Sequence, residues 1–363
     1  MSASIVCLFF LLASGLTYAV PNEGVYFGTQ NLILTDRNPI PTKCIYNTFQ
    51  KMLQAMCANL NFNQLPPRLR KDTQILDFSG NRLRDLKNDT LSSFTSLSFI
   101  YFTDNFFTDI EDAAFVNLKK LEVLDLSKNA LSDIPKNIFA LPAIRIIYLS
   151  ENKLGDNAMD PTPFADESTL QILDVSKNHL TKLPRLGILP YLKRLNVSRN
   201  LITNLKTEDI AAFCTLKVLD LSHNPIIFTD HCECQAINAW IVARNITMFP
   251  PKFNCTDEKR SDGLRTPWCT RQPVNELVSN ETLKIYDNCK NVLKIQEQTV
   301  KARSTWILVV SCIAAFLMCL FIILYCIHRH NKKKKSVNIK RDLVINRADD
   351  GLLKGNNVTE PAE

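Results

Sequence analysis

One repeated motif constrains this chain of 363 residues more than any other feature of its sequence. The unit is L-x-x-L-x-L-x-x-N-x-L, and one copy runs from Leu121 to Leu131. Its asparagine recurs at intervals of 22 to 26 residues, and a near-constant period of this length indicates a repeat architecture. The seven repeat asparagines are Asn81, Asn105, Asn129, Asn152, Asn178, Asn200 and Asn224.

Each unit predicts a short strand that cannot bury its own apolar face. Leu124 and Leu126 alternate along the chain, so both side chains lie on one side of the strand. Stacked copies bury that side together, which predicts an α/β solenoid (a horseshoe) with a parallel sheet on its concave face. We expect each repeat asparagine to turn inward and bond backbone groups that stacking leaves unpaired. Four aromatic residues late in their repeats are expected to fill the convex side of the core: Phe94, Phe115, Phe139 and Phe213.

Two apolar segments predict how the chain meets a membrane. Ile5–Leu12 lies within a segment, 1–19, that has the pattern of a secretory signal peptide. The segment 306–327 holds 22 residues without a charge, enough to span a bilayer as a helix. The basic block 328–335 follows it and is expected to stay in the cytoplasm. We therefore expect a single-pass type I protein of the plasma membrane with an extracellular N-terminus.

Cysteines flank the repeats on both sides. Eight of them fall in the part expected outside the cell, where an even number argues for disulfide bonds. A zinc site at His231-Cys232-x-Cys234 is less consistent with an oxidising compartment, so no metal or other cofactor is expected. The eight cysteines are Cys44, Cys57, Cys214, Cys232, Cys234, Cys255, Cys269 and Cys289.

The repeat and its flanks together resemble extracellular leucine-rich-repeat proteins, such as Toll-like receptors, Slit and related adhesion proteins. The resemblance implies a disulfide cap at each end of the solenoid, with Cys44 and Cys57 in the N-terminal one. In the C-terminal cap it implies a bond from Cys232 to Cys255 and another from Cys234 to a later cysteine. Whether that later cysteine is Cys269 or Cys289 stays open, as does the role of Cys214. The expected organisation is signal peptide 1–19, N-terminal segment and cap 20–72, repeats 73–226, C-terminal cap 227–289, stalk 290–305, span 306–327 and cytoplasmic tail 328–363.

An aromatic and basic patch is the candidate ligand-binding region. In most repeats the fifth position of the unit is Asp, the ordinary choice in this family, so these carboxylates are expected to serve mainly the scaffold. The second and fourth repeats depart from the pattern with Phe99, Tyr101, Arg145 and Tyr148, a composition common at binding hot spots. These side chains are predicted to bind an extracellular protein; the alternative is that exposed aromatic residues simply cover the sheet.

Sequons predict where glycans limit access to the protein surface. Asn196 occupies the fifth position of the sixth repeat, so a glycan there would cover the C-terminal half of the concave face. The five expected glycosylation sites are Asn88, Asn196, Asn245, Asn254 and Asn280.

The sequence leaves two classes of function open. No catalytic motif is present, and the 36-residue tail is too short for a signalling domain, so no enzyme is expected. The net charge of +7 comes largely from the tail and does not indicate nucleic-acid binding. The first class is a binding protein of the adhesion, co-receptor or decoy type. The second is an accessory subunit of a channel or receptor that pairs through small residues of the span, Cys312, Ala315 and Cys319.

Overall fold

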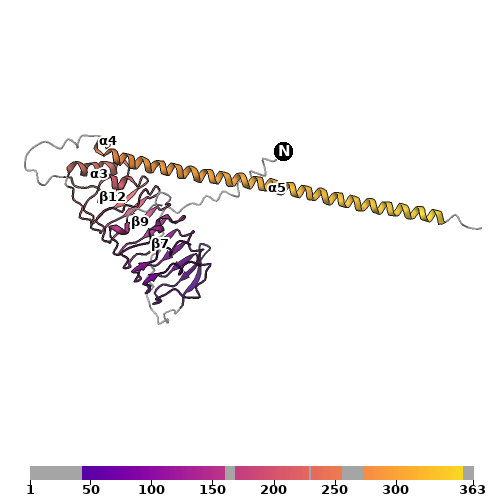
Figure 1. The fold of residues 1–363 in the computed structure, drawn as a ribbon, viewed down its shortest axis with the longest axis horizontal. Coiled ribbons are helices and arrows are strands. Elements are labelled where there is room, and N and C mark those ends of the chain that lie inside the picture. Colours follow the sequence, from indigo (N-terminus) through magenta and orange to yellow (C-terminus); the bar gives the residue numbers. More distant parts are fainter. Residues whose placement is uncertain (1–42, 160–167, 229, 256–273, 355–363) are drawn as a thin grey trace, which may run out of the picture. The chain divides into compact units, whose positions relative to one another are not determined.

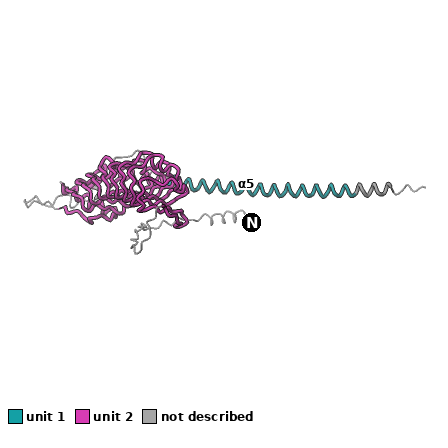
Figure 2. The backbone as a smooth tube through the Cα atoms, turned by 90° about the horizontal axis from the view of Figure 1, so that it is seen from below, with its two compact units in different colours: residues 1–32, 297–363 teal, residues 33–296 magenta. Residues whose placement is uncertain are grey.

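The computed structural model describes residues 43–159, 168–228, 230–255 and 274–354 (Figure 1). The expected signal peptide, Cys269 and the end of the tail lie outside these residues. The chain consists of two compact units, one comprising Ile33–Gln296 and the other the two ends of the chain (Figure 2). The unit Ile33–Gln296, drawn in magenta, contains all the repeats.

The repeats form the parallel solenoid that the motif predicts. Within the described residues, ten strands make one sheet, in which only the first strand is antiparallel to its neighbour. The sheet extends beyond the seven repeat strands because both flanks contribute to it. In sheet order the strands are β1 (Ile45–Phe49), β2 (Met52–Met56), β3 (Ile75–Asp77), β5 (Phe99–Tyr101), β7 (Val123–Asp125), β8 (Ile146–Tyr148), β9 (Ile172–Asp174), β10 (Arg194–Asn196), β11 (Val218–Asp220) and β12 (Thr247–Phe249).

Short and irregular elements return the chain from one strand to the next. Two of them, β4 (Asp85–Leu86) and β6 (Asp109–Ile110), pair as a small second sheet. The others are the 3-10 helices η1 (Lys136–Ala140) and η2 (Asp156–Met159) and the helix α2 (Thr207–Ala211). The four aromatic residues expected in the core, Phe94, Phe115, Phe139 and Phe213, are all buried, which confirms that prediction.

Each repeat asparagine binds the backbone of two successive turns of the chain, its own and the preceding one. The Asn152 Nδ2 donates to the carbonyls of Leu149, in its own repeat, and Leu126, in the preceding one, at 3.1 and 3.0 Å. Its Oδ1 accepts from the Leu131 N–H at 3.1 Å. Equivalent bonds occur at the other six asparagines, which confirms the expected role. Each amide thus bonds buried backbone groups that stacking of the strands would otherwise leave unpaired.

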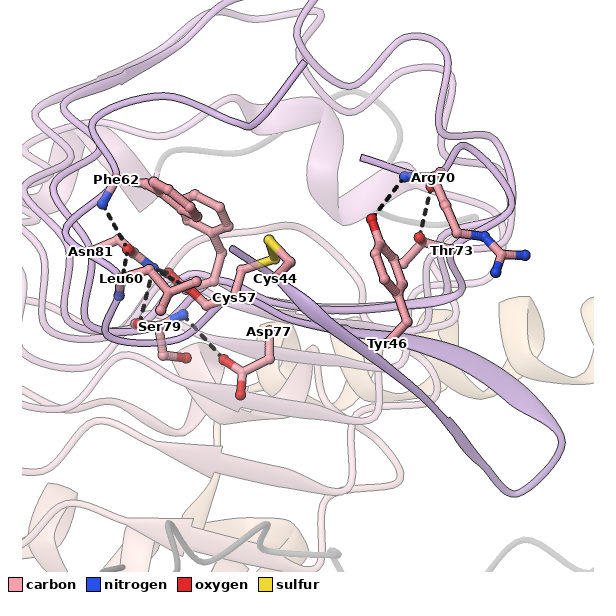
Figure 3. The surroundings of a disulfide bond; sticks show 11 residues. Cys44, Tyr46, Cys57, Leu60, Phe62, Arg70, Thr73, Asp77, Ser79 and Asn81 are labelled. Carbon is pink, nitrogen blue, oxygen red and sulfur yellow. Dashed lines mark hydrogen bonds between the residues drawn. A yellow bond between two sulfur atoms is a disulfide. The ribbon is translucent and has the colours of Figure 1, made fainter. Parts of the chain in front are cut away.

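A disulfide bond closes the hairpin at the N-terminal end of the sheet (Figure 3). Cys44 and Cys57 are bonded next to the antiparallel pair β1 and β2. The first repeat asparagine, Asn81, donates to the Cys57 carbonyl at 2.8 Å, and the Tyr46 hydroxyl accepts from the Arg70 N–H at 3.1 Å. The hairpin is therefore built into the repeat stack and covers its first turn.

At the C-terminal end the structure corrects the expected pairing of cysteines. The implied Cys232–Cys255 bond is wrong, because Cys255 is bonded to Cys234. Both Cys232 and Cys234 lie on α3 (His231–Ala243), and residues two apart point to opposite sides of a helix. Cys234 is the buried one, and Asn238 one turn later holds the Phe253 carbonyl beside Cys255. Cys232 is disulfide-bonded as well.

The two cysteines whose pairing the sequence left open are bonded to each other. Cys214, at the end of the sixth repeat, pairs with Cys289 on α5 (Asn280–Lys354), which follows the short helix α4 (Val274–Leu277). Residues of α5 up to Gln296 belong to the same unit as the solenoid. Farther along, α5 includes the segment 306–327 and is long and apolar enough to cross a membrane.

Candidate ligand-binding face

Strand register places the candidate residues in two rows on the concave face. In each repeat strand the middle residue, such as Leu124, is buried in the core, so the outer two residues face away from it. We call the third-residue row the acidic–aromatic row: Asp77, Tyr101, Asp125, Tyr148 and Asp174 are aligned in consecutive strands. The first-residue row, the apolar row, contains Ile75, Phe99, Val123, Ile146 and Ile172.

The predicted residues come together on neighbouring strands. Tyr101 and Tyr148 each pair with Asp125, which lies between them on β7, and adjacent strands lie about 4.8 Å apart. Phe99 lies two residues before Tyr101 in the apolar row. Arg145 is exposed, immediately before β8, and its Nε lies 3.8 Å from a carboxylate oxygen of Glu122. The positive charge expected in this patch is therefore partly offset by an acidic neighbour.

The aspartates of the acidic–aromatic row support the turns, as the sequence predicts. The Asp125 Oδ1 accepts from the Ser127 N–H at 2.9 Å, and Asp174 bonds Ser176 at the same distance. The Asp77 carboxylate makes the equivalent bond to the Ser79 N–H (Figure 3). One oxygen of each carboxylate thus closes a turn, while the charge of the group remains on the concave face.

The carboxylates of this row also oppose one another electrostatically. Burial raises the pKa of Asp125, and the negative charges of Asp174 and Asp77 raise it further, against the bonds to Ser127 that lower it. Burial, followed by Asp125, Tyr148 and Asp77, raises the pKa of Tyr101 to about 12, so this phenol stays neutral. Among the described residues no Lys or Arg forms an ion pair with these three aspartates. The acidic–aromatic row therefore presents carboxylates that form no ion pair with a described residue, and these carboxylates lie beside the rings of Tyr101 and Tyr148.

The sequence pattern missed two apolar side chains that extend the face. Met56 of β2 aligns with Asp77, and Ile45 of β1 aligns with Met56. Both are largely exposed, at 41% and 53% of their surface. The motif could not reveal them because the hairpin lies outside the repeats; only alternation within 45–56 hints at a strand.

The C-terminal half of the concave face differs in charge. Arg194 occupies the apolar-row position in β10, and Lys193 and Lys217 precede β10 and β11. The half-buried Asn196 donates from Nδ2 to the Asp174 Oδ2 at 3.0 Å and accepts at Oδ1 from Ser198 at 3.1 Å. Among the five sequon asparagines, Asn196 is the one that lies in the sheet. The other four are exposed: Asn88, Asn245, Asn254 and Asn280.

Comparison with known proteins identifies the repeats. The family model described as "Leucine rich repeat" matches residues 100–154 and 168–226. No curated protein sequence matches the chain significantly. A chain in the crystal structure of the mouse RP105/MD-1 complex is similar at 26% identity and a TM-score of 0.40, over 48% of this chain and 30% of that one. The match thus covers less than a third of the solved chain.

Proposed function

Because this chain is a leucine-rich-repeat protein with disulfide-linked flanks, we propose that it is a cell-surface binding protein for an extracellular protein ligand. It belongs to the adhesion, co-receptor or decoy type. The signal pattern of 1–19 and the apolar segment of α5 support a type I orientation at the plasma membrane, with the repeats outside the cell.

One observation carries the choice of binding face. The acidic–aromatic row presents carboxylates that lack ion-pair partners among the described residues, next to Tyr101 and Tyr148. A cationic side chain of a partner would gain from both the carboxylates and the ring faces. In the parallel apolar row, the half-buried Phe99, Ile146 and Ile172 offer uncharged surface beside it, whereas Ile75 and Val123 are buried. We therefore assign binding to the N-terminal half of the concave face and expect a partner surface that carries Lys or Arg among apolar residues.

Proximity labelling of the intact protein on living cells tests this assignment. Labelled partners are compared between wild-type protein and the variants Tyr101→Ala and Tyr148→Ala. The matched controls are Lys193→Ala and Arg194→Ala, which change exposed side chains in the C-terminal half. A partner lost from both tyrosine variants at normal surface levels, but kept by both controls, supports the proposal. The reverse pattern would place the binding face in the C-terminal half.

A further inference from the structure

A small cavity at the C-terminal end of the solenoid is lined by three cations. It has a volume of about 190 Å³ and lies between the start of the last repeat, the end of α3 and the first part of α5. Lys217, Arg244 and Lys290 line it, and no acidic residue does. We propose that this cavity binds an oxyanion, a sulfate or phosphate group. The proposal does not depend on the function of the concave face.

Two aromatic rings hold the central cation in place. The Arg244 guanidinium carbon lies 4.5 Å from the centroid of the Trp240 ring and 4.0 Å from that of Tyr286. The rings themselves meet edge to face at 5.4 Å. A guanidinium that lies against two aromatic rings is held in one position, and its N–H groups can bind an oxyanion in a fork. The buried Arg244 Nε has no acceptor among the described residues.

The other two cations are brought to the cavity by separate elements. Lys217 immediately precedes β11, and Lys290 on α5 lies 5.7 Å from the Tyr286 ring centroid. The disulfide bond between Cys214 and Cys289, the residue before Lys290, fixes α5 against the last repeat. None of the three cations forms an ion pair with a described residue. Like charges gathered in this way repel one another, and a bound anion would remove the repulsion.

Ring stacking alone does not account for this arrangement. Contact with the rings explains the position of Arg244, which lies over both Trp240 and Tyr286, and that of Lys290. It does not explain Lys217, which lines the same cavity without a ring contact among the described residues.

Two sources could supply the oxyanion: a free inorganic ion or the sulfate groups of a glycan chain.

The test follows the thermal stability of the full-length protein in nanodiscs of uncharged lipid. Sodium sulfate, sodium phosphate and a heparin-derived tetrasaccharide are titrated at constant ionic strength, with sodium chloride as the reference. Sulfate and phosphate stabilise folded proteins generally through exclusion from the surface, so the variants decide the outcome. Lys217→Gln and Lys290→Gln each remove one exposed cavity charge and keep Arg244 on its two rings, and Lys217→Gln leaves every cation–ring contact of the cavity in place. Lys193→Gln is the matched control, because Lys193 holds the repeat position of Lys217 one repeat earlier.

We expect a saturable rise in melting temperature for the wild-type protein and the Lys193→Gln control. Each cavity variant should need about tenfold more ligand for half of the effect, since each loses one charge-assisted contact. Tighter binding of the tetrasaccharide than of inorganic sulfate identifies a glycan as the source, and equal or weaker binding identifies a free ion. An identical, non-saturating response in all four proteins would overturn the proposal.

Discussion

Cys214, at the end of the sixth repeat, is bonded to Cys289 of α5, 75 residues farther along the chain. Nearby, the hydroxyl groups of Thr207 and Thr282 lie 2.8 Å apart in a buried hydrogen bond, and Ser279 bonds Glu208. The start of α5 is thus part of the C-terminal cap of the solenoid. The cap does not end at the cysteines nearest to the repeats, but includes the helix that continues into the apolar segment.

Removing this bond should destabilise the cap. In the double variant Cys214→Ser with Cys289→Ser, we expect a loss of about 2–5 kcal/mol in the free energy of unfolding, because a long loop is no longer closed. The protein should be retained in the secretory pathway, as measured by its surface level. Cys319→Ser, a change within the apolar segment, is the control. Wild-type surface levels and melting temperature in the double variant would contradict this role.

The asparagine stack predicts a second effect on stability. Asn152→Ala leaves the buried Leu131 N–H without its side-chain acceptor, whereas the Leu126 and Leu149 carbonyls keep bonds from Asn129 and Asn178. We expect a loss of about 1–3 kcal/mol, the cost of one buried unpaired group. The exposed Asn157 lies in the following turn, and Asn157→Ala should leave the melting temperature unchanged. Equal melting temperatures for the two variants would show that the stack is not needed.

Ionisation of Tyr101 predicts a change at alkaline pH. Its pKa is raised to about 12 in the folded protein, mainly by burial, from an ordinary value near 10. A raised pKa gives stability that is fully present below pH 10 and is lost as the pH rises through 12. Between pH 10 and 11 the wild-type protein should therefore lose stability faster than Tyr101→Phe, as followed by chemical denaturation. Parallel pH profiles would mean that Tyr101 is not shielded in this way.

Replacing small residues in the span distinguishes the two classes of function. Cys312, Ala315 and Cys319 recur along one side of the helix, where another helix could approach closely. Changing all three to Leu should leave the amount of ligand bound per surface molecule within about twofold of wild type, if the ectodomain carries the function. The same triple change should release a membrane partner from an accessory subunit. Loss of the partner with the ectodomain intact would favour that second class.

The repeat motif predicted the solenoid because its chemistry is local and periodic. Leucines at fixed spacing must be buried, and Asn152 must satisfy the backbone of adjacent turns, so one unit predicts the environment of every other. The composition of the acidic–aromatic row followed from the same register. The motif therefore located Tyr101 and Tyr148 on one face without any knowledge of the structure.

The flanks could not be predicted in the same way because they contain no period. Whether Cys232 or Cys234 faces Cys255 depends on which side of α3 packs inward, and the spacing of the cysteines does not reveal that. The Cys214–Cys289 bond joins a repeat to a distant helix, a contact that no local pattern encodes. The basic cavity around Arg244 was missed for the same reason, since its cations come from three separate segments.

Attaching glycans at two matched positions tests the central claim most directly. Asp125→Asn and Asp220→Asn each create the acceptor sequence N-L-S at the same position of a repeat. Asparagine is compatible with the turn, because the Asn196 Oδ1 bonds the Ser198 N–H in the native chain. Glycan attachment is checked by gel mobility after endoglycosidase treatment.

Binding of the identified partner to cells that carry each glycosylated variant is then measured at equal surface level. If the N-terminal half of the concave face binds the ligand, Asp125→Asn should weaken binding by at least about tenfold, while Asp220→Asn should stay within about twofold of wild type. Full binding by Asp125→Asn, or loss of binding only in Asp220→Asn, would contradict the account.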